Sequence, residues 1–241
     1  MNSQKIDLRG EQQKTLETPR YKYSFMARFF FFSLNLVTGK NNDLPKVKLL
    51  EMLASIPYRA WEIRHYLKQT RKYRNIGKVN ESADIINWSR EAQDNEFMHL
   101  LVIHEKMRED NIRDKWYLSP CVAFPMVLFY LLLSRIFAFC NQKRAFLFNA
   151  EFENHAELVY ARLVADNRQW EDQKVTNPLV KMYADVEVWA DVFRRISLDE
   201  RDHMNNSFGF CGKPELVVKY DGMPEPSNNS RSIKNHIAKN I

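Results

Sequence analysis

Residues 95–109, NEFMHLLVIHEKMRE, contain the pattern that decides the fold of this chain. They end a longer segment, residues 84–109, in which apolar side chains such as Phe97, Leu100 and Leu101 recur at steps of three and four residues. This spacing places them on one face of an α-helix. The same stripe contains a glutamate, and a charged residue is costly there unless it is paired or bound to a metal. The sequence therefore predicts a long helix that carries polar groups into an apolar interior.

The rest of the chain also favours helices. Glycine is scarce, with 6 residues in 241, and the glycine-rich phosphate-binding motifs of nucleotide-binding folds are missing. Three dispersed cysteines, Cys121, Cys140 and Cys211, exclude a disulfide framework and a zinc ribbon. We expect one all-α domain of about six helices. Its other segments are residues 21–37, 46–67, 119–140, 144–165 and 179–206.

Composition divides the chain into three parts. Residues 1–20 form a polar N-terminal tail that lacks the apolar run of a secretory signal. Residues 21–210 form a single α-helical domain, and residues 211–241 form a C-terminal tail that we expect to be partly disordered, because Gly, Pro, Asn and Ser are frequent there. The formal net charge of +6 does not by itself select a membrane surface or a nucleic acid as partner. We expect no nucleic acid.

Residues 119–140 form the most apolar window of the chain. The uninterrupted apolar run from Pro120 to Leu133 is 14 residues long, and Arg135 follows it closely. A transmembrane helix needs about 20 apolar residues. This favours a buried bundle helix or a helix in the membrane interface, while a full span stays open.

The step Glu-x-x-His places a carboxylate and an imidazole on one face of a helix. The chain has three such steps, Glu62–His65, Glu96–His99 and Glu200–His203. The first is flanked by Arg59, Arg64 and Lys68, which favours a solvated or interfacial ion-pairing face over metal binding.

The other two steps fit two-metal carboxylate bundles, in which two helices give one glutamate each and two more give a Glu-x-x-His step. Glu51 precedes Glu96 by 45 residues, and Glu153 precedes Glu200 by 47. Each interval has room for a helix, a connection and a returning helix, so the chain reads as two similar halves. Carboxylate and imidazole ligands suit iron or manganese, and two ferrous ions would neutralise four carboxylates.

At these residues the sequence resembles the alternative oxidase family, the di-iron quinol oxidases of mitochondria, plastids and bacteria. The matching segments are LLEMLASIPY (49–58), NEFMHLL (95–101), FENHAELVY (152–160) and DERDH (199–203). The IPY after the first glutamate and the absence of a second histidine after D-E-x-x-H resemble the plastid terminal oxidase branch more than the plant mitochondrial one. The resemblance implies a ferritin-like four-helix di-iron bundle with additional membrane-interfacial helices.

The resemblance also implies roles for individual residues. The ligands of two iron ions would be Glu51, Glu96, His99, Glu153, Glu200 and His203. Tyr160 matches the family's catalytic tyrosine beside the irons, while Asn95 and Asp199 match residues whose hydrogen bonds orient the ligands. The quinol pocket is expected to include Lys46, Leu50 and Tyr58.

Three residues depart from the family pattern near that pocket. Lys46 stands where arginine is usual, and it keeps the charge without the planar guanidinium. Met52 and Val159 stand where threonine is common. These departures bear on the substrate more than on the metal ligands.

The implied activity is oxidation of ubiquinol or plastoquinol with reduction of O₂ to water, in a protein that binds one membrane leaflet without spanning it. Residues 21–37 and the helix of residues 46–74 would supply apolar groups for the acyl boundary and Lys and Arg for the headgroups. The family also implies a homodimer. Two alternatives stay open: a di-iron hydroxylase acting on a quinone or lipid, and a non-catalytic, membrane-peripheral helical protein.

Overall fold

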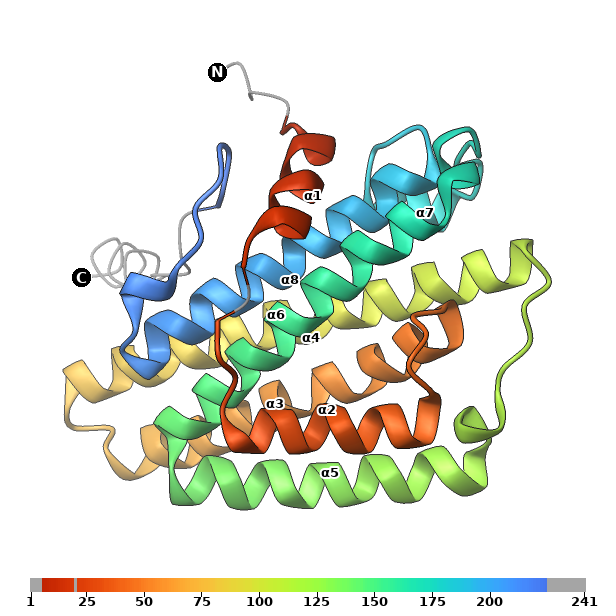
Figure 1. The fold of residues 1–241 in the computed structure, drawn as a ribbon. Helices are drawn as coiled ribbons and strands as arrows, with labels where there is room; N and C mark the ends of the chain where they lie inside the picture. The colour runs from red at the N-terminus through yellow and green to blue at the C-terminus, as the bar shows by residue number, and fades with distance from the viewer. Residues whose placement is uncertain (1–5, 20, 225–241) are drawn as a thin grey trace.

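The computed structural model describes residues 6–19 and 21–224, and these residues form helices connected by short loops (Figure 1). The α-helices are α1 (Leu8–Glu17), α2 (Phe25–Thr38), α3 (Leu44–Arg71), α4 (Ile76–Glu109), α5 (Pro120–Cys140), α6 (Gln142–Asp166), α7 (Pro178–Tyr183) and α8 (Trp189–Cys211). Short 3-10 helices lie at Trp116–Leu118, Arg168–Glu171 and Pro214–Leu216. No strand occurs in the described ranges, so the predicted all-α class is confirmed.

Four long helices form the centre of the molecule. α3 packs along α4 and α6 packs along α8, and further contacts join α3 to α6 and α4 to α8. The helix starts follow from local sequence: the Asp43 side chain accepts a hydrogen bond from the backbone N–H of Lys46 at 3.0 Å, and Asn75 caps α4 in the same way. α3 continues through Pro57, although proline cannot donate the usual backbone hydrogen bond.

The predicted helix of residues 179–206 is wrong in its extent, because the structure has two helices there. α7 ends at Tyr183, and α8 begins only at Trp189. The segment between them is extended, and its Glu187 carbonyl accepts a hydrogen bond from the backbone N–H of Val175 at 2.8 Å. This pairing with the preceding loop replaces the helical hydrogen bonds, and α8 then runs on to Cys211.

Part of the expected N-terminal tail is instead helix α1, which packs on α6 and α8. Its buried residues are polar, and they meet charged partners from distant parts of the chain. Glu11 accepts a hydrogen bond from Arg201 at 2.5 Å, and Arg201 also donates to Glu157 on α6 at 2.9 Å. Gln12 donates to the carbonyl of Ala161 at 2.9 Å. α1 is therefore held by buried polar contacts rather than by an apolar stripe.

The C-terminal segment is ordered up to the end of the described residues. The Asn205 side chain on α8 bonds both the backbone N–H and the carbonyl of Val218, at 2.9 and 2.8 Å. Tyr220 donates to Asp202 at 2.8 Å. Residues 212–224 therefore pack against α8. The remainder of the predicted disordered tail, residues 225–241, lies outside the described residues.

α2 and α5 lie together on the opposite side of the bundle from α1 (Figure 1). α5 packs on α3 and α6 through one face, where Ala123, Tyr130 and Ala138 are buried. Only 17% of its most apolar window is buried inside the molecule, so the expectation of a buried bundle helix is wrong for α5. Within the described residues it is the one helix long and apolar enough to cross a membrane.

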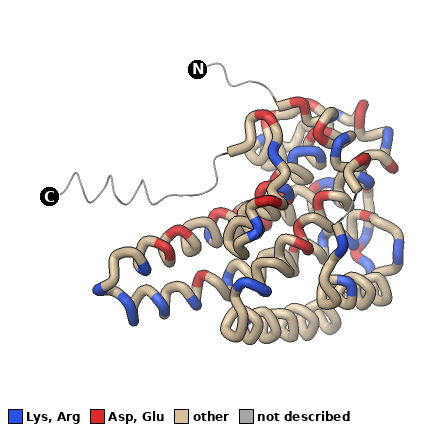
Figure 2. Tube along the Cα trace, turned by 60° about the vertical axis from the view of Figure 1, so that its left-hand side comes forward, with Lys and Arg blue, Asp and Glu red and all other residues tan. Residues whose placement is uncertain are grey.

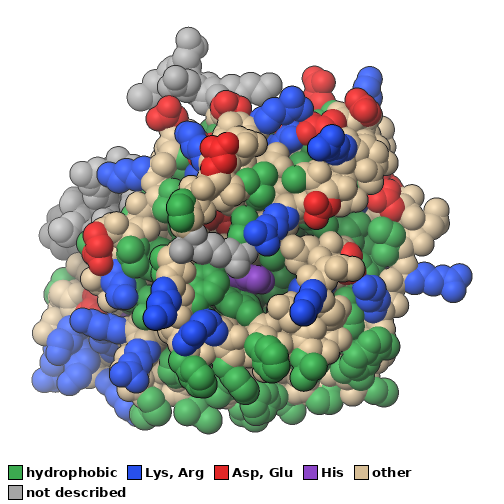
Figure 3. All heavy atoms as spheres, viewed as in Figure 1, with side chains coloured by type: hydrophobic (Ala, Val, Ile, Leu, Met, Phe, Trp, Pro, Cys, Tyr) green, Lys and Arg blue, Asp and Glu red, His purple; other side chains and the backbone are tan. Residues whose placement is uncertain are grey.

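The outward faces of α2 and α5 are apolar. They expose Phe25, Phe29, Phe32 and Leu36 on α2, and Phe124, Phe129, Ile136 and Phe139 on α5. In Figure 3 hydrophobic side chains gather along the lower edge, where these two helices lie. Figure 2 shows that α5, along the bottom, carries almost no charged residue, whereas Lys and Arg collect at the protruding end of the α3–α4 pair.

Candidate metal centre

Six buried carboxylate and imidazole side chains converge from α3, α4, α6 and α8, and they are the six that the sequence singled out. They form two overlapping groups in which the ligand atoms all lie within 4.8 Å of one another. One group is Glu51, Glu96, His99 and Glu200, and the other is Glu96, Glu153, Glu200 and His203. Glu96 and Glu200 belong to both groups, so the two groups share two carboxylates and could hold two neighbouring metal ions.

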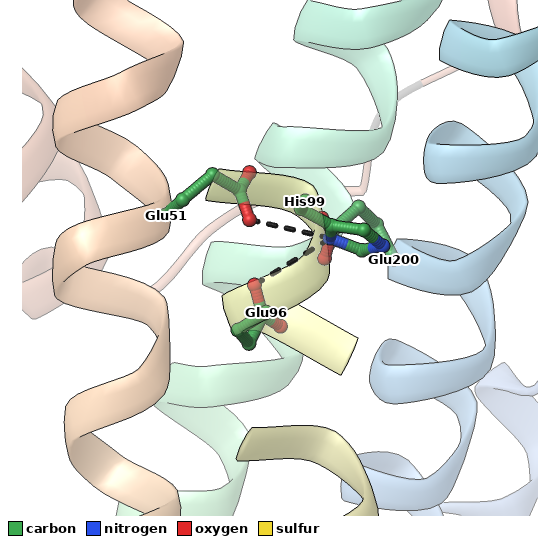
Figure 4. Close-up of side chains that lie close together, drawn as sticks. All are labelled: Glu51, Glu96, His99 and Glu200. Carbon is green, nitrogen blue, oxygen red and sulfur yellow. Dashed lines mark hydrogen bonds and ion pairs between the residues drawn. The ribbon is translucent and has the colours of Figure 1, made fainter. Parts of the chain in front are cut away.

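The imidazoles point their Nδ1 atoms into this cluster. His99 Nδ1 lies 3.2 Å from an oxygen of Glu51 and 3.2 Å from one of Glu200 (Figure 4). Its distance to Glu96 is 3.7 Å. His203 Nδ1 lies 2.8 Å from Glu96 and 3.5 Å from Glu200. Each histidine thus faces both shared carboxylates.

The buried oxygens of the cluster are incompletely satisfied. Both carboxylate oxygens of Glu96 and of Glu200 face Nδ1 of His99 or His203 in ion pairs without forming a hydrogen bond, and Oε2 of Glu153 has neither kind of partner among the described residues. Buried polar atoms are nearly always hydrogen-bonded, so a group of such oxygens on one centre points to a ligand. The donor set of four carboxylates and two imidazoles fits two hard or borderline cations.

The pKa values of the carboxyl groups reflect the burial of several negative charges close together. Burial, together with the charges of Glu200 and Glu96, raises the pKa of Glu51 well above its ordinary value, and the same causes raise the pKa of Glu153. Burial also opposes ionisation of Glu96, but the adjacent His203 and His99 hold its pKa below the ordinary range. The negative charges of neighbouring carboxylates therefore repel one another, and a bound metal ion would offset this repulsion.

Two tyrosines occupy equivalent positions on either side of the cluster. Tyr160 on α6 donates a hydrogen bond to Glu51 on α3, and Tyr58 on α3 donates one to Glu153 on α6, at 2.6 Å in the second case. Each tyrosine follows the glutamate of its own helix by seven residues, or two helical turns. The predicted position of Tyr160 beside the site agrees with this geometry.

Asp199 and Asn95 lie beside the histidine of the first group. His99 Nε2 is 3.4 Å from Oδ2 of Asp199, which also accepts hydrogen bonds from Asn95 at 3.4 Å and from Tyr183 at 2.6 Å. Arg195 bonds the other oxygen of Asp199 through Nε at 2.9 Å. The carboxylate therefore fixes the orientation of the imidazole whose other nitrogen faces the cluster.

Sequence reasoning missed three polar residues of the site, Tyr183, Asn149 and Ser207. Asn149 donates to Glu153 at 3.0 Å, to Tyr58 at 3.1 Å and to Ser207 at 3.1 Å. Asn149 stands one helical turn before Glu153, which is the only signal in the sequence that could have marked it.

The Glu62–His65 step lies away from the cluster. Glu62 forms the expected ion pair, with Arg90 at 2.8 Å. His65 differs from the expectation: it is fully buried and accepts a hydrogen bond from the Gln142 amide. This hydrogen bond joins α3 to the first residue of α6.

The three residues expected in a quinol pocket have other contacts. Lys46 is buried and donates to Asn35 at 2.7 Å and to the carbonyl of Gly39 at 2.9 Å, so it holds the end of α2. Leu50 is buried in the core, and Tyr58 bonds the cluster as described.

The apolar groove of the molecule lies instead between α2 and α5. It has a volume of about 490 Å³ and includes Phe30, Leu34, Tyr130 and Phe148 among its walls. Leu53 on α3 also lines it and follows Glu51 by two residues, whereas Lys46, Leu50 and Tyr58 do not line it.

Comparison with known proteins identifies no family for this chain. No protein-family model matches it, and no curated protein matches it significantly.

Proposed function

We propose that the chain is a di-iron quinol oxidase of the alternative oxidase type, bound to the surface of a membrane. One observation carries the proposal: two four-residue carboxylate–imidazole groups share Glu96 and Glu200, whose buried oxygens face the imidazoles of His99 and His203 in ion pairs but form no hydrogen bond within the described chain. Glu51 and His99 would complete one iron site, and Glu153 and His203 the other. A di-iron centre of this kind supplies paired electrons for the reduction of O₂.

The surrounding residues support this chemistry in defined ways. Asp199 orients His99 through Nε2, and Tyr58 and Tyr160 hold one oxygen each of Glu153 and Glu51. Burial keeps bulk water away from reactive oxygen species. Burial and the neighbouring carboxylates raise the pKa values of Glu51 and Glu153 well above the ordinary value, and the four positive charges of two divalent ions would match the four carboxylates of the site.

A hydrophobic quinol would reach the site from the membrane side. The groove between α2 and α5 supports this route, because its walls are almost entirely apolar. One of its lining residues, Leu53, follows Glu51 by two residues on α3. The exposed phenylalanines of α2 and α5 support association with one leaflet, since an exposed apolar face of this kind marks an interaction site. Ubiquinol and plastoquinol both fit this chemistry, and a homodimer remains part of the proposal by resemblance alone.

Metal analysis and oxygen uptake test the proposal together. The purified chain, loaded anaerobically with ferrous iron, is expected to retain two irons per chain and to consume O₂ on addition of quinol. Glu96→Ala and His203→Ala should lose iron and activity. Glu62→Ala, which removes the contacts with Arg90 and Gln93 in a Glu-x-x-His step outside the cluster, should keep both. Quinol-driven uptake that persists in Glu96→Ala would refute the ligand assignment. A hydroxylated quinone or lipid in place of water as the product would favour the hydroxylase.

A further inference from the structure

Tyr58 differs from Tyr160 in the aromatic residues that pack on its ring: Trp61 and Trp88 pack on Tyr58, and Phe193 packs on Tyr160. We propose that Tyr58, Trp61 and Trp88 form an electron relay that donates to the candidate metal centre when quinol is lacking; the proposal rests on the di-iron function above. In this arrangement the phenol of Tyr58 is hydrogen-bonded to Glu153, and two indoles pack directly on the phenol ring.

The first part of the relay is the tyrosine. Tyr58 is fully buried, and its hydroxyl donates to Glu153 Oε1 at 2.6 Å. Its ring centroid lies 5.6 Å from that of His203. A phenol gives up an electron readily only when its proton has an acceptor. Glu153 provides that acceptor without any rearrangement of the chain.

The second part is the pair of tryptophans. The ring centroids of Trp61 and Trp88 lie 5.3 and 5.2 Å from that of Tyr58, both edge-to-face. The two indoles stack on each other at 5.5 Å with an interplanar angle of 13°. Stacked indoles share a positive charge over both rings, so oxidation of the pair is easier than oxidation of an isolated indole.

The branch behind Tyr160 has the carboxylate acceptor, since Tyr160 donates to Glu51, but among the described residues no indole packs on its ring. Its ring stacks on Phe193 at 6.2 Å, and phenylalanine is not oxidised under conditions that oxidise tyrosine. Beyond Phe193 lie Trp170 and Trp189, and the ammonium of Lys106 sits over both rings, at 5.5 and 5.0 Å. A cation over an aromatic face opposes the appearance of positive charge there. Among the described residues, no such cation–π contact involves Trp61 or Trp88.

The electrons and protons of the relay balance. Reduction of O₂ to two waters takes four electrons, of which two ferrous ions supply two and quinol normally supplies the rest. Without quinol, Tyr58 loses one electron to the O₂-oxidised centre and passes its phenolic proton to Glu153. An electron from the Trp61–Trp88 pair then restores Tyr58 as the proton returns, which leaves a radical cation on the indoles. A second oxidation of Tyr58 supplies the other missing electron, and it leaves a tyrosyl radical on Tyr58 with the phenolic proton on Glu153.

The experiment uses the full chain loaded anaerobically with ferrous iron and exposed to O₂ without quinol. Freeze-quenched samples are analysed by electron paramagnetic resonance, with deuterated tryptophan to identify the radical. We expect a tryptophan radical in the parent chain and its loss in Tyr58→Phe. In Trp88→Phe the tryptophan signal should fall relative to the tyrosyl signal of Tyr58, while the matched control Trp170→Phe should retain the tryptophan signal.

A second readout follows the chemical products. After repeated O₂ exposure, peptide mass spectrometry should find oxidised indoles at Trp61 and Trp88 in the parent chain but not in Tyr58→Phe. Iron content and helix content are measured for each variant, so that Trp88→Phe carries the test if Tyr58→Phe fails to load iron. A radical confined to Tyr160, Trp170 or Trp189, or an undiminished tryptophan signal in Tyr58→Phe, would overturn the relay. Iron binding with quinol-driven uptake but no tryptophan radical overturns the relay alone, whereas absence of iron binding overturns the proposed function.

Discussion

Replacing Arg201 with methionine removes the cation that joins α8 to α6 and α1. The arginine is 2% exposed, and it donates to Glu157 at 2.9 Å, to Glu11 at 2.5 Å and to Thr15 at 2.8 Å. Glu157 is 4% exposed, and burial already raises the pKa of its carboxyl against the attraction of Arg201. Without the arginine this carboxylate is left buried and unpaired or must take up a proton.

The magnitude follows from the burial of all three charges. Removing one partner of a buried ion pair costs about 3–5 kcal/mol, which is a large share of the roughly 5–15 kcal/mol that stabilises a domain. For a chain of this size the midpoint of thermal unfolding should fall by about 10 °C. Urea unfolding of the metal-free chain, followed by circular dichroism, measures the free energy directly. Arg162→Met, an exposed arginine on α6, is the control and should change it by less than about 0.5 kcal/mol.

A triple variant separates the loss of pairing from the loss of packing. Arg201→Met combined with Glu157→Gln and Glu11→Gln leaves no buried charge unpaired, so it should regain much of the stability lost in Arg201→Met. The reasoning is refuted if Arg201→Met costs less than about 1 kcal/mol, or if the triple variant is no more stable than the single one.

Three further predictions concern the pH dependence, the metal site and the membrane face. Burial, with Lys68 and Arg64 nearby, lowers the pKa of His65 to about 4 from an ordinary value of 6.5. The neutral ring therefore contributes stability that is fully present above pH 6.5 and is lost as the pH falls, because the unfolded chain binds the proton first; the loss at pH 4 is about 3 kcal/mol. Subtracting the urea-unfolding profile of His65→Leu from that of the parent should reveal this slope, and parallel profiles would contradict it. Asp199→Asn should weaken iron binding about 10- to 100-fold in a chelator competition, because the imidazole of His99 loses its anionic partner; unchanged affinity would remove Asp199 from the site. Phe129→Glu on the outer face of α5 should abolish flotation with phospholipid vesicles while leaving iron content intact, and flotation equal to that of the parent would place the membrane contact elsewhere.

The local pattern of the sequence indicated the long helices α3 to α6 and the six converging residues, although it missed α1 and the break between α7 and α8. In an α-helix, positions three and four residues apart share a face, so a Glu-x-x-His step already states which two groups point the same way. The apolar residues expected beside Glu96 lie on another face of α4, because Phe97 is 57% exposed and Leu100 and Leu101 are half-buried. The paired intervals from Glu51 to Glu96 and from Glu153 to Glu200 then required only that successive helices return antiparallel. The direction of side chains that share one face of a single helix was therefore predictable from the sequence.

Contacts between segments far apart in the sequence were decided by the tertiary structure alone. The sequence of α1 is typical of a polar tail because its buried face is polar, and its partner Arg201 stands 190 residues from Glu11. Tyr58 was expected near a quinol, yet its hydroxyl bonds Glu153, 95 residues away, and its ring packs between tryptophans of α3 and α4. The sequence determines which residues share a helix face, because that depends on backbone geometry within a few residues. Which faces meet depends on the free energy of burying them together, and only the folded chain brings those faces into contact.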